Sequence, residues 1–306
     1  MEKINGNKTE TKSVLSYLYE TNAFQVFEDN KPFWYTSGKI GPYYINTHYL
    51  YGSKEKAEEL LECIDSLLVD KEKLVTEINM MTCANYEKNE IFKDVINKMI
   101  KTIENIADVE NIDYISGGER RDWFFSIPLA RCLKKKHITI FKDGTIIVFD
   151  GNNGTFIADN TIKKLNMEKM FDVTSNIIHI TDLVTEASSF DKYWVPFLRN
   201  EGGKIAKCLS VVDRKQGGAE KLLEHNIKLC SIFQIDEDFF KAAMGEGLIN
   251  ESQYKLLVDY IKNPDLAMAN FIKENPEFLT ESLASYDAKT RARAKLCIEK
   301  EIYKVI

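Results

Sequence analysis

Residues 176–218, NIIHITDLVTEASSFDKYWVPFLRNEGGKIAKCLSVVDRKQGG, decide the fold of this 306-residue chain. In chain order the pattern predicts a strand over residues 177–180, a polar loop over 181–189, an amphipathic helix over 190–200, a Gly-Gly turn and a second strand over 205–212. A strand, a crossover helix and a second strand make a βαβ unit, whose two strands lie parallel in one sheet. The stretch therefore indicates an α/β fold.

The loop of this unit is chemically suited to bind a sugar phosphate. A helix N-terminus presents unpaired N–H groups and the positive end of the helix dipole, and small hydroxyl residues precede this one. Asp182 follows the first strand and supplies a carboxylate that can accept hydrogen bonds from ribose hydroxyls. Ligands of open α/β sheets bind outside the carboxyl ends of the strands, so we expect a binding site at this loop.

Composition excludes several classes of protein. The chain is 44% hydrophobic and 29% charged, which is typical of a globular protein. No apolar run approaches the roughly 20 residues that span a bilayer, and the polar N-terminus lacks the apolar core of a signal peptide. The six scattered cysteines form no CxxC pair, which favours reduced thiols. We therefore expect a cytoplasmic protein with no membrane partner, and the net charge of −6 argues against a nucleic-acid partner.

The rest of the chain alternates helical and strand patterns. Ser53 is the predicted N-cap of a long helix, Asp143-Gly144 is the predicted type I′ turn of a hairpin, and the methionines of residues 79–86 are interpreted as core packing. Helices are predicted over residues 11–20, 53–74 and 89–107, a hairpin and extended segment over 23–52, a strand, Gly-Gly loop and helix over 114–136, a hairpin over 137–152, a strand over 227–236, and helices from 237 onward with boundaries at the two Asn-Pro pairs.

This order of elements predicts a mainly parallel sheet flanked by helices. We expect residues 1–235 to form one α/β domain, which residues 53–107 enlarge as a helical insertion. Residues 236–306 are expected to form a helical extension packed on that domain.

Four segments, in this order, resemble the type I phosphoribosyltransferases, most closely the branch that uses orotate. TSGKIGPYYIN (residues 36–46) resembles the N-terminal hood segment of that family, and SGGERRDWFFSIPLA (116–130) resembles its Gly-rich pyrophosphate loop. ITDLVTEASS (180–189) resembles the loop that binds 5-phosphoribosyl 1-pyrophosphate (PRPP), and VVDRKQGG (211–218) resembles the segment that carries an arginine for orotate. The resemblance spans most of the first 235 residues and implies the fold of that family.

The resemblance also implies an activity. The family transfers a phosphoribosyl group from PRPP to a base, here orotate, and releases pyrophosphate in a step of pyrimidine nucleotide biosynthesis. Mg²⁺ would be held mainly by PRPP rather than by side chains of the protein, so no residue is assigned as a metal ligand. The family further implies a homodimer.

Individual residues acquire roles from the same resemblance. Asp182 would hold the ribose hydroxyls, and Arg214 the orotate carboxylate. Lys142 is expected to act in catalysis beside the pyrophosphate, since it is the only basic residue of the hairpin. The other expected substrate-binding residues are Lys39, Tyr44 and Ile45 at the orotate pocket, Arg120 and Arg121 at the pyrophosphate, and Thr185, Ser188 and Ser189 at the 5′-phosphate. Structural alternatives remain open: core packing for Tyr44 and Ile45, helix capping for Asp182, and solvated surface positions for the basic residues.

The chain departs from the family pattern at four places. Thr181 stands where the family has the first of two adjacent acids, and Glu186 adds a carboxylate near the 5′-phosphate, which we expect to point to solvent. A compact hairpin over residues 141–153 replaces the mobile catalytic loop of the family. Phe125 replaces a lysine of the pyrophosphate loop, and Arg120 and Arg121 are our suggested source of the missing positive charge.

Three functions therefore compete. The favoured one is an orotate-using phosphoribosyltransferase with a divergent pyrophosphate site. The second is a phosphoribosyltransferase for another base, against which the retention of Arg214 beside an aromatic segment argues. The third is a PRPP or nucleotide sensor without catalysis, which Thr181 and the missing loop lysines favour.

Overall fold

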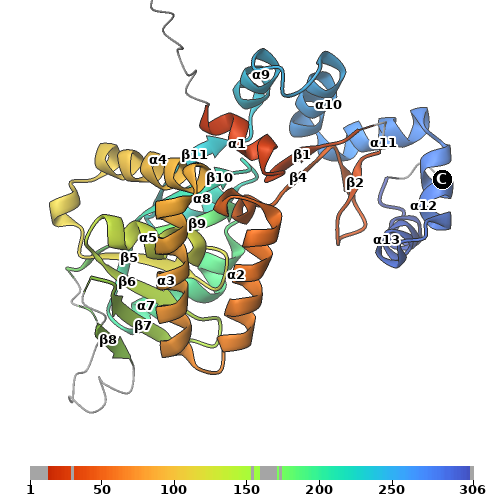
Figure 1. Cartoon of the computed structure of the whole chain (residues 1–306). Coiled ribbons are helices and arrows are strands. Elements are labelled where there is room, and N and C mark those ends of the chain that lie inside the picture. The colour runs from red at the N-terminus through yellow and green to blue at the C-terminus, as the bar shows by residue number, and fades with distance from the viewer. Residues whose placement is uncertain (1–12, 29–30, 153–154, 159–170, 172–173, 304–306) are drawn as a thin grey trace, which may run out of the picture.

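A seven-stranded sheet forms the centre of the molecule (Figure 1). The computed structural model describes residues 13–28, 31–152, 155–158, 171 and 174–303. The strand order is β11-β10-β9-β5-β6-β7-β8; β11, β10, β9, β5 and β6 are parallel, and β7 and β8 continue the sheet antiparallel. The strands are β5 (Tyr114–Gly118), β6 (Lys136–Ile140), β7 (Ile146–Asp150), β8 (Thr155–Ala158), β9 (Asn176–Val184), β10 (Lys204–Asp213) and β11 (Lys228–Gln234). The mainly parallel sheet predicted from the sequence is confirmed.

The βαβ unit that led to this prediction is β9, a crossover helix and β10. The crossover begins with a π-helical turn, Phe190–Trp194, and continues as α7 (Val195–Asn200). Strand β9 is longer than predicted, because its pairing with β10 continues through Thr181–Ser210 to Val184–Asp213. The assignment of residues 181–184 to a loop was therefore wrong, and Thr181 and Asp182 stand on rigid strand backbone.

Helices cover both faces of the sheet, and each face has its own core. Helices α4 (Glu90–Ile106) and α5 (Trp123–Cys132) pack on one face, over residues such as Ile178 and Ile180 of β9. Helices α7 and α8 (Gly218–Glu224) pack on the other face, over Ile177. Alternate residues of one strand serve opposite faces because strand side chains alternate with a period of two.

Residues 53–107, predicted to be a helical insertion, contain one more helix than the sequence patterns predicted. Its helices are α2 (Lys54–Leu67), α3 (Lys71–Lys88) and α4, and Figure 1 shows α2 and α3 running side by side beside the sheet. Ser53 caps α2 as predicted, since its hydroxyl accepts from the N–H of Lys56. Helix α3 was missed because its apolar residues lack a clear one-sided stripe. Met81 packs against the core as interpreted, but Met80 is exposed.

The N-terminal segment forms small antiparallel pairs beside the carboxyl ends of the main strands. After α1 (Val14–Glu20), whose predicted start at residues 11–12 lies outside the described part, β1 (Phe24–Val26) pairs with β4 (Tyr43–Ile45), and β2 (Phe33–Trp34) pairs with β3 (Ile40–Gly41). The short 3₁₀ helix η1 (Thr47–Tyr51) leads from β4 to α2.

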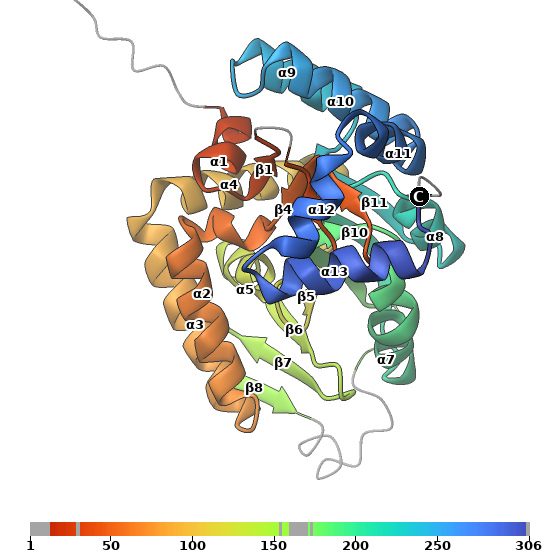
Figure 2. The ribbon, with the colours of Figure 1, turned by 90° about the vertical axis from the view of Figure 1, so that its right-hand side faces the viewer.

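The C-terminal helices pack on this N-terminal segment (Figure 2). The ring of Trp34 stacks on Phe278, and its Nε1 donates to Ser282 Oγ at 3.0 Å. Tyr303 Oη accepts from the backbone N–H of Ile40 at 2.7 Å. The helices are α9 (Glu237–Gly245), α10 (Glu251–Lys262), α11 (Pro264–Glu274), α12 (Glu277–Ala284) and α13 (Ala288–Glu299). The two predicted Asn-Pro boundaries are confirmed, since they separate α10 from α11 and α11 from α12.

The predicted β6–β7 hairpin is present, but its turn is not type I′. A type I′ turn needs positive φ at both central residues, and here only Gly144 has it, at +91°. The N–H of Gly144 instead donates to the carbonyl of Phe141 at 3.1 Å, which closes a turn over residues 141–144. Helix α3 holds this turn: Lys71 pairs with Asp143 and donates to Thr145 Oγ1 at 2.6 Å. Asn153, the end of the predicted loop replacement, lies outside the described residues.

Among the residues with assigned positions, no helix has the length and apolarity that crossing a membrane requires. All six cysteines are free thiols.

Candidate functional site

A cleft of about 440 Å³ opens at the carboxyl ends of β5 and β9. Three segments line it: the β5–α5 loop, the tip of the β6–β7 hairpin, and the end of β9 with the loop that follows. It contains seven of the predicted site residues, namely Arg120, Arg121, Lys142, Asp182, Thr185, Ser188 and Ser189. Parallel strands place their carboxyl ends at one edge, so residues from separate parts of the chain converge there.

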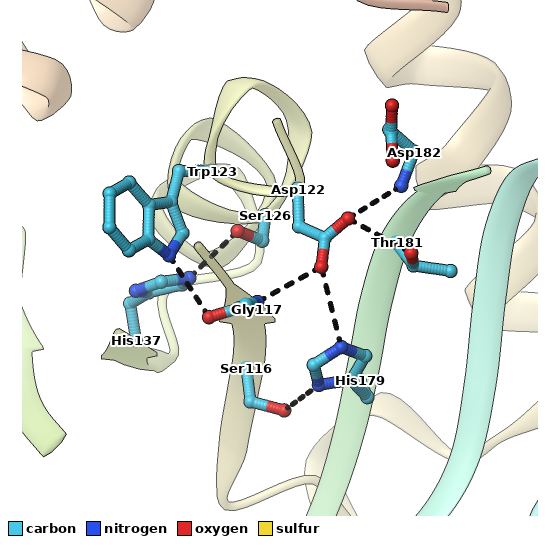
Figure 3. Close-up of polar contacts among 10 residues, drawn as sticks. Ser116, Gly117, Asp122, Trp123, Ser126, His137, His179, Thr181 and Asp182 are labelled. Atoms are coloured by element: carbon cyan, nitrogen blue, oxygen red, sulfur yellow. Dashed lines mark hydrogen bonds and ion pairs between the residues drawn. The ribbon is translucent and has the colours of Figure 1, made fainter. Parts of the chain in front are cut away.

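Two carboxylates meet at the inner wall of the cleft (Figure 3). Asp122 Oδ1 accepts from the backbone N–H of Asp182 and from Thr181 Oγ1, both at 2.9 Å. Asp122 Oδ2 accepts from the N–H of Gly118 at 3.1 Å. Asp182 Oδ2 accepts from Thr47 Oγ1 of η1 at 2.7 Å. Asp182 thus stands between the β5–α5 loop and the N-terminal segment, and it does not cap a helix.

The surroundings of Asp182 favour its protonated form. Burial and the neighbouring charge of Asp122 raise the pKa of Asp182 to about 7, although the hydroxyl of Thr47 and the charge of Arg121 act in the opposite direction. In the unfolded chain this carboxyl would lose its proton near pH 4. The contribution of this proton to stability is therefore present at low pH and is lost as the pH rises through about 7. Near neutral pH, a cationic or hydroxyl-bearing ligand that favours the ionised form would bind with release of a proton.

Buried histidines stand behind this pair. His179 Nδ1 lies 2.9 Å from Ser116 Oγ, and its Nε2 lies 3.7 Å from Asp122 Oδ2. His137 contacts Thr139 and Ser126 through its two ring nitrogens, at 2.8 and 2.9 Å. Burial lowers the pKa of His137 to about 3, so this ring is neutral at physiological pH. His179 is completely buried and hydrogen-bonded, so it is a residue of the core.

Three basic residues also line the cleft. Arg120 pairs with Asp65 of α2, whereas Arg121 and Lys142 are exposed. Glu119 Oε2 accepts from the backbone N–H of Lys142 at 3.0 Å, which ties the β5–α5 loop to the hairpin. The peptide bond between Glu119 and Arg120 is cis. Burial, together with the charges of Arg121 and Arg120, lowers the pKa of the nearby His48 to about 3, so that residue adds no positive charge.

The loop after β9 supplies hydroxyls and backbone N–H groups. Thr185, Ser188 and Ser189 line the cleft directly before the π-helical turn, as the sequence predicted. This loop packs closely against the start of α8, since an added Cβ at Gly218 would lie 2.6 Å from the carbonyl oxygen of Thr185. Glu186 is exposed at the cleft.

Three of the predicted orotate-pocket residues lie away from the cleft wall. Lys39 is exposed and pairs with Asp265 of α11 at 2.7 Å. Tyr44 is 38% exposed and its ring neighbours are Phe33 and Tyr35. Ile45 is buried in the core. None of the three lines the described cleft.

Arg214 does not line the cleft, but it contacts both the end of β9 and strand β4. Its backbone N–H donates to the carbonyl of Val184 at 2.9 Å, next to the loop that follows β9. Its guanidinium lies over the ring of Tyr43, 5.3 Å from the centroid, and its Nε is buried without a hydrogen-bond partner. A buried guanidinium nitrogen without a hydrogen-bond partner costs free energy.

Sequence reasoning missed Asp122, Glu119, Thr47 and Trp194, which line the cleft or hold the residues that do. Asp122 carried a usable signal: it is an acid four residues after a buried strand, at the edge where the ends of parallel strands meet. Thr47 had none, because it is 135 residues from its partner.

Gly118 gives a test of how tightly the cleft floor is packed. A Cβ at this position would overlap with the indole of Trp194, so we expect Gly118→Ala to lower the free energy of unfolding by about 1–3 kcal/mol. Gly245→Ala is the matched control, because a Cβ there meets no heavy atom within 4 Å. Urea unfolding of both variants measures the difference, and equal midpoints would contradict the packing.

Comparisons with known proteins bear on the fold and on the family that this chain resembles. No protein-family profile matches the chain. The orotate phosphoribosyltransferase of Sulfurisphaera tokodaii is 26% identical over 226 residues, covering 74% of this chain and 87% of the relative. That of Saccharolobus solfataricus is 24% identical over the same shares. Among solved structures, the orotate phosphoribosyltransferase of Francisella tularensis superposes with a TM-score of 0.50 and 13% identity, covering 81% of this chain and 96% of that one, which supports the fold.

Proposed function

We propose that this chain, a divergent orotate phosphoribosyltransferase-like member of the type I phosphoribosyltransferases, transfers the phosphoribosyl group of PRPP to orotate. The products are orotidine 5′-monophosphate and pyrophosphate, in pyrimidine nucleotide biosynthesis. One observation carries the proposal: a single cleft combines the Asp182 carboxylate, a hydroxyl-rich loop before a helical turn, and three basic side chains. These are the groups that a ribose, its 5′-phosphate and a pyrophosphate require.

In this proposal the chain binds PRPP along the cleft. Thr185, Ser188 and Ser189 hold the 5′-phosphate, with hydroxyls and backbone N–H groups at the start of the helical turn. Asp182, in its ionised form, accepts from the ribose hydroxyls. Arg121 and Lys142 face the pyrophosphate, and Arg120, which pairs with Asp65, is the third basic residue of the cleft.

Catalysis then needs position and charge rather than a covalent nucleophile. A ring nitrogen of orotate attacks the anomeric carbon as the bond to pyrophosphate breaks, so negative charge grows on the leaving group. Arg121 and Lys142 stabilise that charge, and the strand-mounted Asp182 keeps the ribose in line.

Mg²⁺ enters this scheme with the substrate. The part of the chain with assigned positions has no group of three or more His, Cys, Asp or Glu side chains able to hold a metal ion. In this proposal the ion keeps most of its waters and is bound mainly by the substrate phosphates. When bound to PRPP, the ion neutralises charge on the departing pyrophosphate.

A steady-state assay with Mg²⁺, PRPP and orotate tests the function, with orotate consumption and pyrophosphate release followed together. Matched turnover of both supports the proposal. Turnover of another base instead of orotate, or PRPP binding without turnover of any base, would contradict it and favour the second or third candidate function.

Arg214 is the proposed contact for the carboxylate of orotate. Arg214→Ala is expected to lower kcat/KM for orotate by about 10²-fold, because charge-assisted hydrogen bonds are worth about 1.5–3 kcal/mol. Arg214→Lys keeps the charge but loses the planar fork, so we expect an intermediate loss. Lys215→Asn removes an adjacent exposed cation and serves as the control. A similar loss in the control, or an unchanged KM for orotate in Arg214→Ala, would contradict this role.

We propose further that the enzyme is a cytoplasmic homodimer. Six free cysteines support a reducing compartment, and the dimer rests on analogy with the family. Light scattering on the purified protein measures the dimer directly. We also retain the division into an α/β domain over residues 1–235, with the insertion 53–107, and a helical extension over 236–306; the contacts of Trp34 and Ile40 with the extension support its packing on the domain.

A further inference from the structure

Asp122 begins helix α5, yet its side chain does not cap that helix. Aspartate at this position ordinarily accepts from an N–H of the first helical turn. Here both carboxylate oxygens turn away, toward Gly118 of β5 and toward Thr181 and Asp182 of β9. The side chain therefore joins the ends of two neighbouring strands across the sheet.

Burial of the Asp122 carboxylate costs free energy unless hydrogen bonds compensate for the lost water. The residue is only 5% exposed, and a buried carboxylate is tolerated when it is fully hydrogen-bonded. Three hydrogen bonds occupy its two oxygens, so it has little capacity left for a ligand. Asp182 is the more exposed of the two acids, and it is the one that a ligand in the cleft reaches.

We propose that Asp122 is a positioning residue for Asp182: its buried carboxylate fixes the backbone of Asp182 and presents a like charge to the carboxyl that holds the ribose. The inference deepens the proposed function and rests on it for the identity of the ligand. The geometry assigns Asp122 no contact with substrate. Instead, Asp122 controls the orientation of Asp182 and the pH at which Asp182 becomes ionised.

The groups facing Asp182 determine the direction of that control. Asp122 and Arg121 face it from the β5–α5 loop, and the hydroxyl of Thr47 faces it from η1. His179 of β9 faces Asp122 from behind. The remaining charged residues of the cleft are Glu119, Arg120, Lys142 and Glu186. Because Asp122 opposes ionisation and Thr47 assists it, removing each should shift the titration of Asp182 in opposite directions.

The first measurement needs no substrate. Carbon-13 NMR of aspartate-labelled protein, without Mg²⁺ or PRPP, follows the carboxyl of Asp182 between about pH 4 and 9, with Asp182→Asn identifying its signal. We expect Asp122→Asn to lower the titration midpoint by about one unit or more, and Thr47→Val to raise it. A midpoint unchanged in Asp122→Asn would overturn the proposal. Should that variant fail to fold, the wild type decides alone: the carboxyl signal of Asp122 must change at the titration midpoint of Asp182, and an Asp122 signal that does not respond at that midpoint overturns the inference.

The second measurement tests whether the ionisation of Asp182 governs the binding of PRPP. Calorimetric titration with PRPP and Mg²⁺ over the same pH range compares the wild type, both single asparagine variants and the double variant. Substrate ionisation is common to all four and cancels. We expect the midpoint of the affinity profile to fall in Asp122→Asn, and the double variant to bind like Asp182→Asn alone. If the losses of PRPP affinity in the two single variants add up in the double variant, and the pH profile of Asp122→Asn is unshifted, Asp122 has a purely structural role and the proposal is overturned. Absence of PRPP binding in the wild type would instead contradict the proposed function, and the substrate-free titration would still test the pair.

Discussion

Replacing Asp182 with asparagine is expected to lower kcat/KM for PRPP by about 10²–10³-fold. The carboxylate is proposed to accept from two ribose hydroxyls, and hydrogen bonds to a charged group are worth about 1.5–3 kcal/mol each. Asparagine is nearly isosteric, so it keeps the contact of position 182 with Thr47 while it removes the charge. Steady-state kinetics with PRPP varied at saturating orotate measures the loss.

Glu186→Gln is the matched control for this experiment. Both acids line the same cleft, but Glu186 is exposed and no ribose contact is assigned to it. We expect Glu186→Gln to raise kcat/KM for PRPP by at most a few-fold, because the variant removes a negative charge that repels the phosphates. Equal losses in the two variants would show that the net charge of the cleft matters and that Asp182 has no specific role.

Replacing Trp123 with alanine is expected to lower the free energy of unfolding by about 3–5 kcal/mol. The ring is completely buried at the start of α5 and meets Phe141 edge-on at a centroid distance of 4.9 Å. Its Nε1 also donates to the carbonyl of Gly117 at 3.0 Å. Truncation would leave a cavity between the β5–α5 loop and the hairpin, as well as a buried carbonyl without its donor. Unfolding in urea, followed by circular dichroism, measures the change.

Two further variants bracket this result. Trp123→Phe keeps most of the ring and loses the Nε1 donor, so we expect a smaller loss. Tyr286→Ala removes a fully exposed aromatic ring and should change stability by less than about 0.5 kcal/mol. A loss in Trp123→Ala no larger than that of Tyr286→Ala would show that the loop and the hairpin are held together by other contacts.

Local patterns of the sequence were sufficient for most of the scaffold. The βαβ unit, the β6–β7 hairpin, the cap at Ser53 and the Asn-Pro helix boundaries all follow from interactions within a few residues. Two predictions were wrong because local patterns do not register contacts with distant segments of the chain. The type I′ turn at Asp143 failed because Lys71, from a distant helix, holds the loop, and β9 exceeded its predicted length because β10 continues to pair with it.

The segment over residues 182–189 was also readable, since Asp182 near the end of β9 and Thr185, Ser188 and Ser189 in the loop after it all line the cleft. The positions of Lys39 and Arg214 were not. Lys39 pairs with Asp265, 226 residues later, and the surroundings of Arg214 depend on how β4 packs over the end of β10. These contacts depend on packing between elements, which no local pattern specifies.

By itself, then, the sequence determined the parallel α/β architecture and a hydroxyl-rich loop at the end of a strand, because hydrophobic periodicity and turn chemistry act over short distances along the chain. Only the tertiary structure decided which side chains surround that loop. The order of strands places β5 beside β9, and this brings Asp122 against Asp182 across 60 residues. Thr181 stands where the family resemblance places an acid, and the carboxylate beside Asp182 comes from Asp122 in the loop after the neighbouring strand β5, since hydrogen bonds and charges act through space.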